Sequence, residues 1–181
     1  MVAKLYCFGE SGNAYKAALT MTLAGYAWEP VFVDFFRGEA RSPEFLALNE
    51  MGEAPVLVDG DRTITQSGVI QLMVAEKTGM FMGAPEDRDE ALRWLFWDNH
   101  KGSSQFGTLR FLMNFLPEDK RPQETIQWLS GRVRAALKTL EAHLAGRGWM
   151  VGDGPTLADF ACCAYLYYPA PFGFAREDYP N

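Results

Sequence analysis

The segment at residues 52–67, GEAPVLVDGDRTITQS, constrains the fold more than any other part of the chain. Pro55 has no N–H for a sheet ladder and favours an extended conformation at Ala54, whose backbone N–H and C=O we expect to be unpaired. Three apolar residues then form a short strand, and the turn signal at 59–61 begins a hairpin. Ser67 is expected to cap the helix that follows. An extended edge beside a helix N-terminus suits a ligand that carries a carboxylate.

The same letters also fit a purely structural hairpin, in which the proline protects a sheet edge and the serine only caps a helix. A second helix start favours the ligand-binding interpretation. It lies in FGESGNAYKAAL, directly after an apolar strand predicted at residues 4–8. The predicted elements follow the order βαβαββα, which pairs parallel strands through helical crossovers first and adds an antiparallel hairpin last.

After residue 79 every predicted element is a helix. We therefore expect an α/β domain at residues 1–79, a linker with glycine and proline breakers at 80–87, and an all-α domain at 88–181. Within the helical part, Thr156 and Asp159 have the spacing of a helix capping box, which makes them structural rather than catalytic.

Composition excludes several classes of partner. The 181 residues carry 17 basic and 23 acidic side chains and a net charge of −6, and no Lys/Arg run is present, so a nucleic-acid partner is not expected. No apolar stretch is long enough to span a membrane and no signal peptide is visible, which predicts a cytoplasmic protein. With two histidines no metal site is expected. Cys7, Cys162 and Cys163 are expected to be reduced, with Cys7 packed in the first strand.

Four motifs together resemble the cytosolic glutathione transferases. They are SGNAYK after the first strand, SPEFLALNEMGEAPVLVDGD, TQS, and WMVGDGPTLADFA. Their order and spacing match that family over nearly the whole chain, and the bacterial serine-type members are the most similar. The resemblance implies a thioredoxin-like first domain that binds glutathione as co-substrate, an all-α second domain and a homodimer. Relatives usually continue into at least one more helix, so the last helix of the family is expected to be missing from this sequence.

By this resemblance, Ser11 takes the position of the serine whose hydroxyl hydrogen-bonds the glutathione sulfur. A neutral donor at a helix N-terminus favours thiolate over thiol, so the protein activates the nucleophile without supplying it. Asn13 is the alternative donor to the same sulfur. A plain helix-capping role for Ser11 is the other interpretation of the same residue.

The resemblance also assigns residues to the rest of glutathione. Gln66 and Ser67 hold the γ-glutamyl end, with the serine hydroxyl and backbone N–H on the α-carboxylate. Glu53 and Ala54 precede Pro55, and the Ala54–Pro55 bond is expected to be cis, which frees the backbone of Ala54 to pair with the cysteinyl unit like an added strand.

Two further groups of residues are predicted with open alternatives. Arg41 either clamps the glycyl carboxylate or lies solvated on its loop. Trp97, His100 and Phe106 either line a hydrophobic pocket for the acceptor substrate or belong to the helical core, since an aromatic stripe at helical spacing fits both.

The function implied is a glutathione transferase that joins the thiolate to hydrophobic electrophiles, as in detoxification, or reduces peroxides with it. One alternative is a non-catalytic binding or interaction module of the same fold. Another is a glutathione-dependent isomerase, although GESGNAYK lacks the Ser-Ser-Cys-type motif of those relatives. The intact SGN and TQS motifs favour an enzyme, because an interaction module does not need a thiol-activating hydroxyl.

Overall fold

The computed structural model describes residues 2–181 and divides into two compact units, Met1–Met82 and Gly83–Asn181. The first unit is mixed α/β and the second is helical, so the predicted fold class is confirmed. The predicted linker at 80–87 straddles the division and contains a short 3-10 helix, η3 (Pro85–Asp87).

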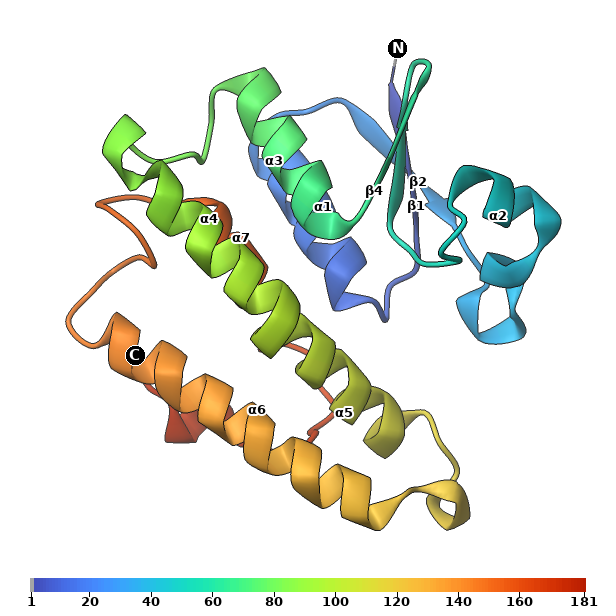
Figure 1. Ribbon diagram of the computed structural model, residues 1–181, viewed down its shortest axis with the longest axis vertical. Coiled ribbons are helices and arrows are strands. Elements are labelled where there is room, and N and C mark those ends of the chain that lie inside the picture. Colours follow the sequence, from blue (N-terminus) through green and yellow to red (C-terminus); the bar gives the residue numbers. More distant parts are fainter. Residues whose placement is uncertain (1) are drawn as a thin grey trace. The chain divides into compact units, whose positions relative to one another are not determined.

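The first unit is a four-stranded sheet covered by three helices (Figure 1). Its elements in chain order are β1 (Ala3–Cys7), α1 (Gly12–Leu23), β2 (Trp28–Phe32), α2 (Pro43–Leu48), β3 (Val56–Asp59), β4 (Arg62–Thr65) and α3 (Ser67–Thr78). The strand order is β2-β1-β3-β4, with β1 and β2 parallel and the other pairs antiparallel. This is the thioredoxin-like arrangement expected from the order βαβαββα.

Successive residues of β3 explain why both faces of the sheet are covered. Val56 and Leu57 are both buried, and side chains of neighbouring strand residues point to opposite faces. Leu57 packs in one core cluster with Met21 of α1 and Ile70 of α3, the two helices that lie side by side on one face in Figure 1. Val56 packs in another cluster with Phe45 of α2. The hairpin is therefore fixed from both sides.

The helical unit is formed by α4 (Arg88–Trp97), η4 (Asp98–Ser103), α5 (Ser104–Asn114), α6 (Gln123–Leu144) and α7 (Leu157–Cys162). The long α6 runs beside α5, and the two contribute to one core cluster (Figure 1). A second cluster joins α4 to α7. No helix within residues 2–181 is both long and apolar enough to cross a membrane.

A π-helical stretch, η4, joins α4 to α5. The buried carboxylate of Asp98 accepts from the backbone N–H of Ser103 at 3.2 Å and from its hydroxyl at 3.0 Å. A Cβ at Gly102 would lie 2.5 Å from Asp98 Oδ1, so the turn requires a glycine there. Such π-helical turns widen a helix locally and re-aim its side chains.

The capping box at α7 is confirmed. Asp159 accepts from the backbone N–H of Thr156 at 2.8 Å, and the Thr156 hydroxyl accepts from Ala158 N–H at 3.3 Å. The other carboxylate oxygen of Asp159 accepts from Met150 N–H at 2.8 Å. The aspartate thus closes a helix start and holds the preceding loop, which is a structural role.

Candidate functional site

Ser11 is the N-cap of α1, as the capping interpretation predicts. Its Oγ accepts from the backbone N–H of Ala14 at 3.1 Å, and its own N–H donates to the carbonyl of Phe8 at 3.1 Å. A hydroxyl that accepts one hydrogen bond still carries an O–H to donate. Within the described part of the chain that O–H has no acceptor. Capping and donation to a ligand are therefore compatible in the same side chain.

Ser67 and Asn13 meet although they come from different helices. The Ser67 hydroxyl donates to Asn13 Oδ1 at 3.2 Å, and Ser67 is only 4% exposed. The bond joins the first turns of α1 and α3, so two helix N-termini, each with a partial positive charge, lie at one place. With its oxygen occupied by Ser67, Asn13 keeps its amide N–H groups to donate elsewhere.

The expectation that Ser67 caps α3 is wrong. The N-cap is Gln66, and Ser67 is the first residue of the helix. Gln66 has φ 68° and ψ 120°, an uncommon conformation for a residue other than glycine, and such strain occurs most often at functional sites. The Ser67 hydroxyl is consequently directed to Asn13 rather than to a backbone N–H of its own helix.

The Gln66 side chain faces the residues before the proline. Its Nε2 donates to Glu53 Oε2 at 3.2 Å and to Met51 Sδ at 3.3 Å. These contacts bring together two residues that the sequence assigned to one ligand, Gln66 and Glu53. They also include Met51, which sequence reasoning did not single out.

The Ala54–Pro55 peptide bond is cis, as the resemblance implied. Asn49 Nδ2 donates to the carbonyl of Glu53 at 2.7 Å, which fixes the chain just before it. Neither backbone polar group of Ala54 is hydrogen-bonded to another part of the chain within residues 2–181. The unpaired edge predicted at Ala54 is therefore present.

Arg41 lies against the same loop. Its Nη1 donates to the carbonyl of Met51 at 3.1 Å, and a Cβ on Gly52 would come within 2.5 Å of that nitrogen. Gly52 also has φ +62°, so both its backbone conformation and the closeness of Arg41 require a glycine. Arg37, the neighbouring loop arginine, is instead mostly exposed and 3.7 Å from Asp34 Oδ2. The two arginines thus have different surroundings, and only Arg41 is held at the loop.

Cys7 is partly buried and packs against the core of the first unit. It is half-buried in β1, and burial raises the pKa of its thiol above the usual value. A thiol with a raised pKa carries little thiolate at neutral pH, so it is a poor nucleophile. The packed-thiol interpretation of Cys7 agrees with the structure.

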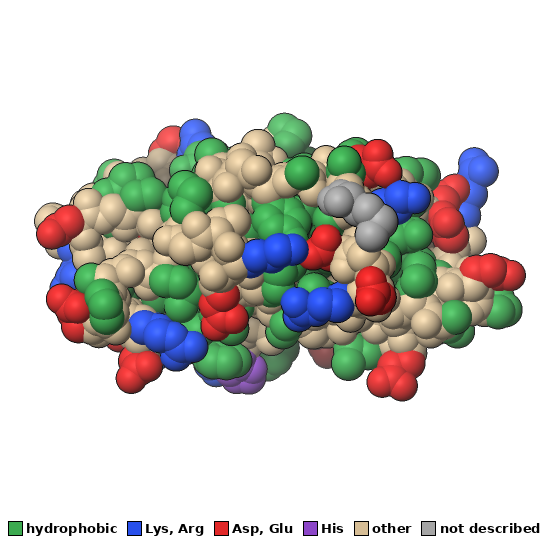
Figure 2. Space-filling view, turned by 90° about the horizontal axis from the view of Figure 1, so that it is seen from above, with side chains coloured by type: hydrophobic (Ala, Val, Ile, Leu, Met, Phe, Trp, Pro, Cys, Tyr) green, Lys and Arg blue, Asp and Glu red, His purple; other side chains and the backbone are tan. Residues whose placement is uncertain are grey.

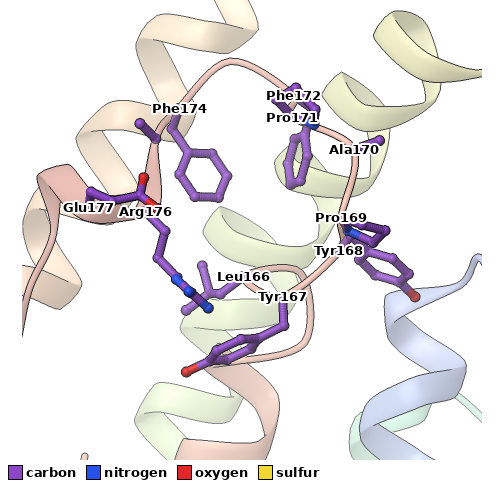
Figure 3. Close-up of a pocket in the computed structure, with 11 residues that line it drawn as sticks. Leu166, Tyr167, Tyr168, Pro169, Ala170, Pro171, Phe172, Phe174, Arg176 and Glu177 are labelled. Atoms are coloured by element: carbon purple, nitrogen blue, oxygen red, sulfur yellow. The ribbon is translucent and has the colours of Figure 1, made fainter.

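The three residues predicted for an acceptor pocket have different surroundings in the helical unit. Phe106 is 1% exposed inside the core of that unit, His100 is exposed on η4, and Trp97 is half-buried against Trp94, with 5.1 Å between ring centroids. The burial of Phe106 corresponds to the core alternative. A hollow lined by residues 166–177, with Arg176 over the ring of Tyr167, contains none of the three (Figure 3).

An aromatic cluster in the first unit was missed by sequence reasoning. Phe8 stacks on Phe35 at 4.5 Å between ring centroids, and Phe36 stands edge-on to both at 5.8 and 5.9 Å. Phe36 is 51% exposed, and the backbone of Phe8 is hydrogen-bonded to that of Ser11. The sequence feature that could have indicated this cluster is the adjacent pair Phe35 and Phe36, which lies in an otherwise polar loop.

The charges on the face drawn in Figure 2 do not suggest a polyanionic ligand. On the face drawn in Figure 2, Lys and Arg side chains are interspersed with Asp and Glu side chains rather than gathered in one patch. Within residues 2–181 there is also no group of three or more His, Cys, Asp or Glu side chains able to hold a metal ion.

Comparisons with known proteins match both units. The model of the glutathione S-transferase N-terminal domain matches residues 1–76, and that of the C-terminal domain matches residues 104–181. The chain is 30% identical over 172 residues to glutathione S-transferase F10 of Arabidopsis thaliana, covering 91% of this chain and 80% of that protein. It is 27% identical over 186 residues to maleylacetoacetate isomerase of Pseudomonas aeruginosa, covering 98% and 86%.

Solved structures agree with these matches. A possible glutathione S-transferase from Rhodopseudomonas palustris has a TM-score of 0.89 and 31% identity, covering 99% of this chain and 89% of that chain. A glutathione transferase from Pseudomonas putida, solved with one glutathione disulfide bound per subunit, has a TM-score of 0.80 and 27% identity, covering 91% and 74%.

Proposed function

Because this chain belongs to the glutathione S-transferase family, we propose that it activates the thiol of glutathione for attack on an electrophilic small molecule. The observation that carries the proposal is the pair of helix N-termini joined by Ser67 and Asn13, with the Ser11 hydroxyl at the start of α1. This arrangement offers hydrogen-bond donors and positive helix ends to a ligand that bears a carboxylate and a thiolate.

In the proposed reaction, Ser11 donates its O–H to the glutathione sulfur once the thiol proton has left to solvent. The bond stabilises the thiolate and not the thiol, so the pKa of the bound thiol falls. The sulfur then attacks an electrophilic carbon, a carbon–sulfur bond forms, and the leaving group departs with the electron pair of the bond that breaks. Asn13 supplies a second neutral donor.

The remaining contacts hold glutathione in place. Ser67 and Gln66 bind the γ-glutamyl end, and the free backbone groups of Ala54 pair with the cysteinyl unit. Arg41, kept at the loop by the carbonyl of Met51, takes the glycyl carboxylate. Glu53 is oriented by Gln66 and accepts from the γ-glutamyl ammonium.

For the hydrophobic acceptor, we propose a surface in the first unit in place of the residues of the helical unit expected from the sequence. Phe8, Phe35 and Phe36 offer a partly exposed aromatic surface whose first member is three residues before Ser11. Aromatic surfaces with a few directed polar groups are typical of small-molecule sites. Phe106, in contrast, contributes to the core of the helical unit.

A second candidate is a glutathione-dependent isomerase, which the similarity to maleylacetoacetate isomerase favours. A thiolate that adds to a conjugated double bond and leaves again after rotation uses the same Ser11 and Ser67 contacts. A non-catalytic module of the same fold is the remaining alternative.

Four measurements separate these functions. Calorimetry with glutathione tests binding, an assay with 1-chloro-2,4-dinitrobenzene tests conjugation, and assays with cumene hydroperoxide and with maleylacetoacetate test the other reactions. We expect binding and conjugation, both reduced in Ser11→Ala. The matched control is Ser42→Ala, since Ser42 also caps a helix of the first unit, accepting from Phe45 N–H at 3.2 Å. Binding without any turnover would support the non-catalytic module instead.

We also propose a cytoplasmic homodimer. Phe96 on α4 is 70% exposed and Phe111 on α5 is also exposed, and apolar side chains of this size on a surface commonly mark an interface. Sedimentation at micromolar concentration that shows only monomer would contradict the dimer, and recovery with the membrane fraction would contradict the location.

A further inference from the structure

Met51 is an exposed methionine whose sulfur makes a polar contact. Its side chain is 49% exposed in the loop between α2 and β3, and Gln66 Nε2 donates to its Sδ at 3.3 Å. The same nitrogen donates to Glu53 Oε2 at 3.2 Å, so both N–H groups of the Gln66 amide are used. The amide oxygen accepts no hydrogen bond within residues 2–181, which leaves it available to the γ-glutamyl end of a ligand.

The backbones on both sides of this contact are held in place. The Met51 carbonyl accepts from Arg41 Nη1 at 3.1 Å, and the Met51 N–H donates to Asn49 Oδ1 at 3.2 Å. The Gln66 carbonyl accepts from the N–H of Ile70 at 3.0 Å in the first turn of α3. A chemical change at the Met51 sulfur must therefore be taken up by the two side chains.

A thioether that is exposed to solvent can be oxidised by a hydroperoxide. A sulfur lone pair attacks one peroxide oxygen, the O–O bond breaks, an S–O bond forms, and water or an alcohol leaves after a proton moves to the departing oxygen. The sulfur is oxidised and the peroxide is reduced by the same electron pair. The product, methionine sulfoxide, is polar, and its oxygen accepts hydrogen bonds more strongly than a thioether sulfur, which is a weak acceptor.

The sulfoxide cannot keep the observed contact. A nitrogen 3.3 Å from the sulfur leaves no room for an oxygen atom between them, so the Gln66 amide must turn. Its hydrogen bond to Glu53 is disturbed as well, because the same nitrogen makes both contacts. We propose that Met51 is a modification site, at which a hydroperoxide forms the sulfoxide, displaces the Gln66 side chain and so lowers the affinity for glutathione. This inference rests on the proposed function, in which Gln66 and Glu53 hold the γ-glutamyl end.

The test oxidises the full chain with hydrogen peroxide, removes the peroxide with catalase, and adds dithiothreitol, which reverses sulfenic acids and disulfides but not methionine sulfoxide. Peptide mass spectrometry should find one added oxygen at Met51. Calorimetry should then show glutathione bound about tenfold more weakly, because a hydrogen bond to a charged group of the ligand is lost. Methionine sulfoxide reductases should restore the affinity. Met51 that stays unmodified while Met80 is oxidised, or oxidised Met51 with unchanged glutathione affinity, would overturn the proposal.

Two leucine variants locate the effect. Met80 provides the matched control, since it is 40% exposed in the same unit and its sulfur makes no hydrogen bond in the described part of the chain. Met80→Leu should lose glutathione affinity on peroxide treatment as wild type does. Met51→Leu, whatever its starting affinity, should bind glutathione equally well before and after treatment. The same fall in Met51→Leu as in wild type would assign the damage to another residue and refute the location.

A second readout does not need glutathione. In an NMR spectrum of nitrogen-labelled protein, the side-chain amide resonance of Gln66 should shift when Met51 is oxidised and return after reduction. A resonance that does not move would overturn the proposal, with or without transferase activity. Unoxidised protein that binds no glutathione would contradict the proposed function, whereas binding that survives oxidation of Met51 would contradict this inference alone.

Discussion

The hydroxyl of Ser67 donates to Oδ1 of Asn13 at 3.2 Å, so residues 54 positions apart share one hydrogen bond at the starts of α1 and α3. The residue proposed for the α-carboxylate of glutathione therefore also orients a residue proposed for its sulfur. Binding of one end and activation at the other are connected through this bond.

We expect Ser67→Ala to raise the KM for glutathione more than it lowers kcat, because on binding the single O–H of Ser67 turns from Asn13 to the carboxylate, and that hydrogen bond is present in the ground state and in the transition state. Since Asn13 loses its restraint as well, the free-energy effects of Ser67→Ala and Asn13→Ala should not add in the double variant. Calorimetry and steady-state kinetics measure both effects. Unchanged glutathione affinity in Ser67→Ala would remove that residue from the site.

Ser11→Ala should lower kcat/KM by about ten- to a hundredfold, since hydrogen bonds to charged groups contribute about 1.5–3 kcal/mol. The pKa of the bound glutathione thiol should rise, so the rate at fixed pH below that pKa falls with the thiolate fraction. Ultraviolet absorbance of the thiolate in the glutathione complex measures the pKa directly. The helix end and Asn13 should retain part of the effect, so activity should not vanish.

A different result would assign the activation of the thiol to another residue. If Ser11→Ala leaves both the thiol pKa and the conjugation rate unchanged while Asn13→Ala or Cys7→Ala abolishes them, the serine is only a helix cap. The Ser42→Ala control separates loss of a cap from loss of a thiolate donor.

Asp159→Ala should destabilise the fold by about 0.5–2 kcal/mol or slightly more, because the carboxylate closes a capping box and also holds Met150 N–H. The folded fraction should bind glutathione with unchanged affinity. Thermal melts and calorimetry test this, with Asp159→Asn as the milder variant that retains one acceptor oxygen. An unchanged Tm together with lost activity would identify a catalytic carboxylate instead.

Asp59 should make stability depend on pH. The Lys77 ammonium at 2.9 Å and the Tyr26 hydroxyl at 2.7 Å both donate to its carboxylate and hold the pKa of Asp59 below its usual range. A carboxyl whose pKa is lower in the folded state stabilises above its unfolded pKa of about 3.9, and this contribution is lost as pH falls through the folded pKa.

The Tm difference between wild type and Asp59→Asn should therefore be largest near neutral pH and disappear in acid. Asp61→Asn, in the same turn but exposed and outside this network, is the control. A Tm difference that stays constant from neutral to acid pH would show that charge on Asp59 contributes nothing.

Features set by neighbouring residues could be predicted from the sequence. The capping box at Thr156 and Asp159 depends on a spacing of three residues, and it is found as expected. The cis bond at Pro55 was inferred only through the family resemblance, since local sequence does not distinguish it from the common trans form. The fold class followed from the order of periodic segments together with that resemblance.

Features set by distant residues could not be predicted. The positive φ of Gln66 depends on contacts with Met51 and Glu53, which are distant in the sequence. The sequence therefore predicted Ser67 as the N-cap of α3, one residue after the observed N-cap. Periodicity put Phe106 on an apolar helix face but could not tell a buried face from a pocket wall. The stacking of Phe8 on Phe35 joins residues far apart in the sequence, so the adjacent Phe35 and Phe36 do not by themselves reveal their partner.

Met51 has a consequence for which ligands the site accepts. Its carbonyl accepts from Arg41 and its sulfur from Gln66, the residues proposed for the glycyl and γ-glutamyl ends. Because Met51 contacts both side chains, it restrains the distance between Arg41 and Gln66, the two residues proposed to hold the ends of the ligand. If Arg41 and Gln66 hold these two ends as proposed, we expect a tripeptide to contact both residues and a γ-glutamyl dipeptide to contact only Gln66.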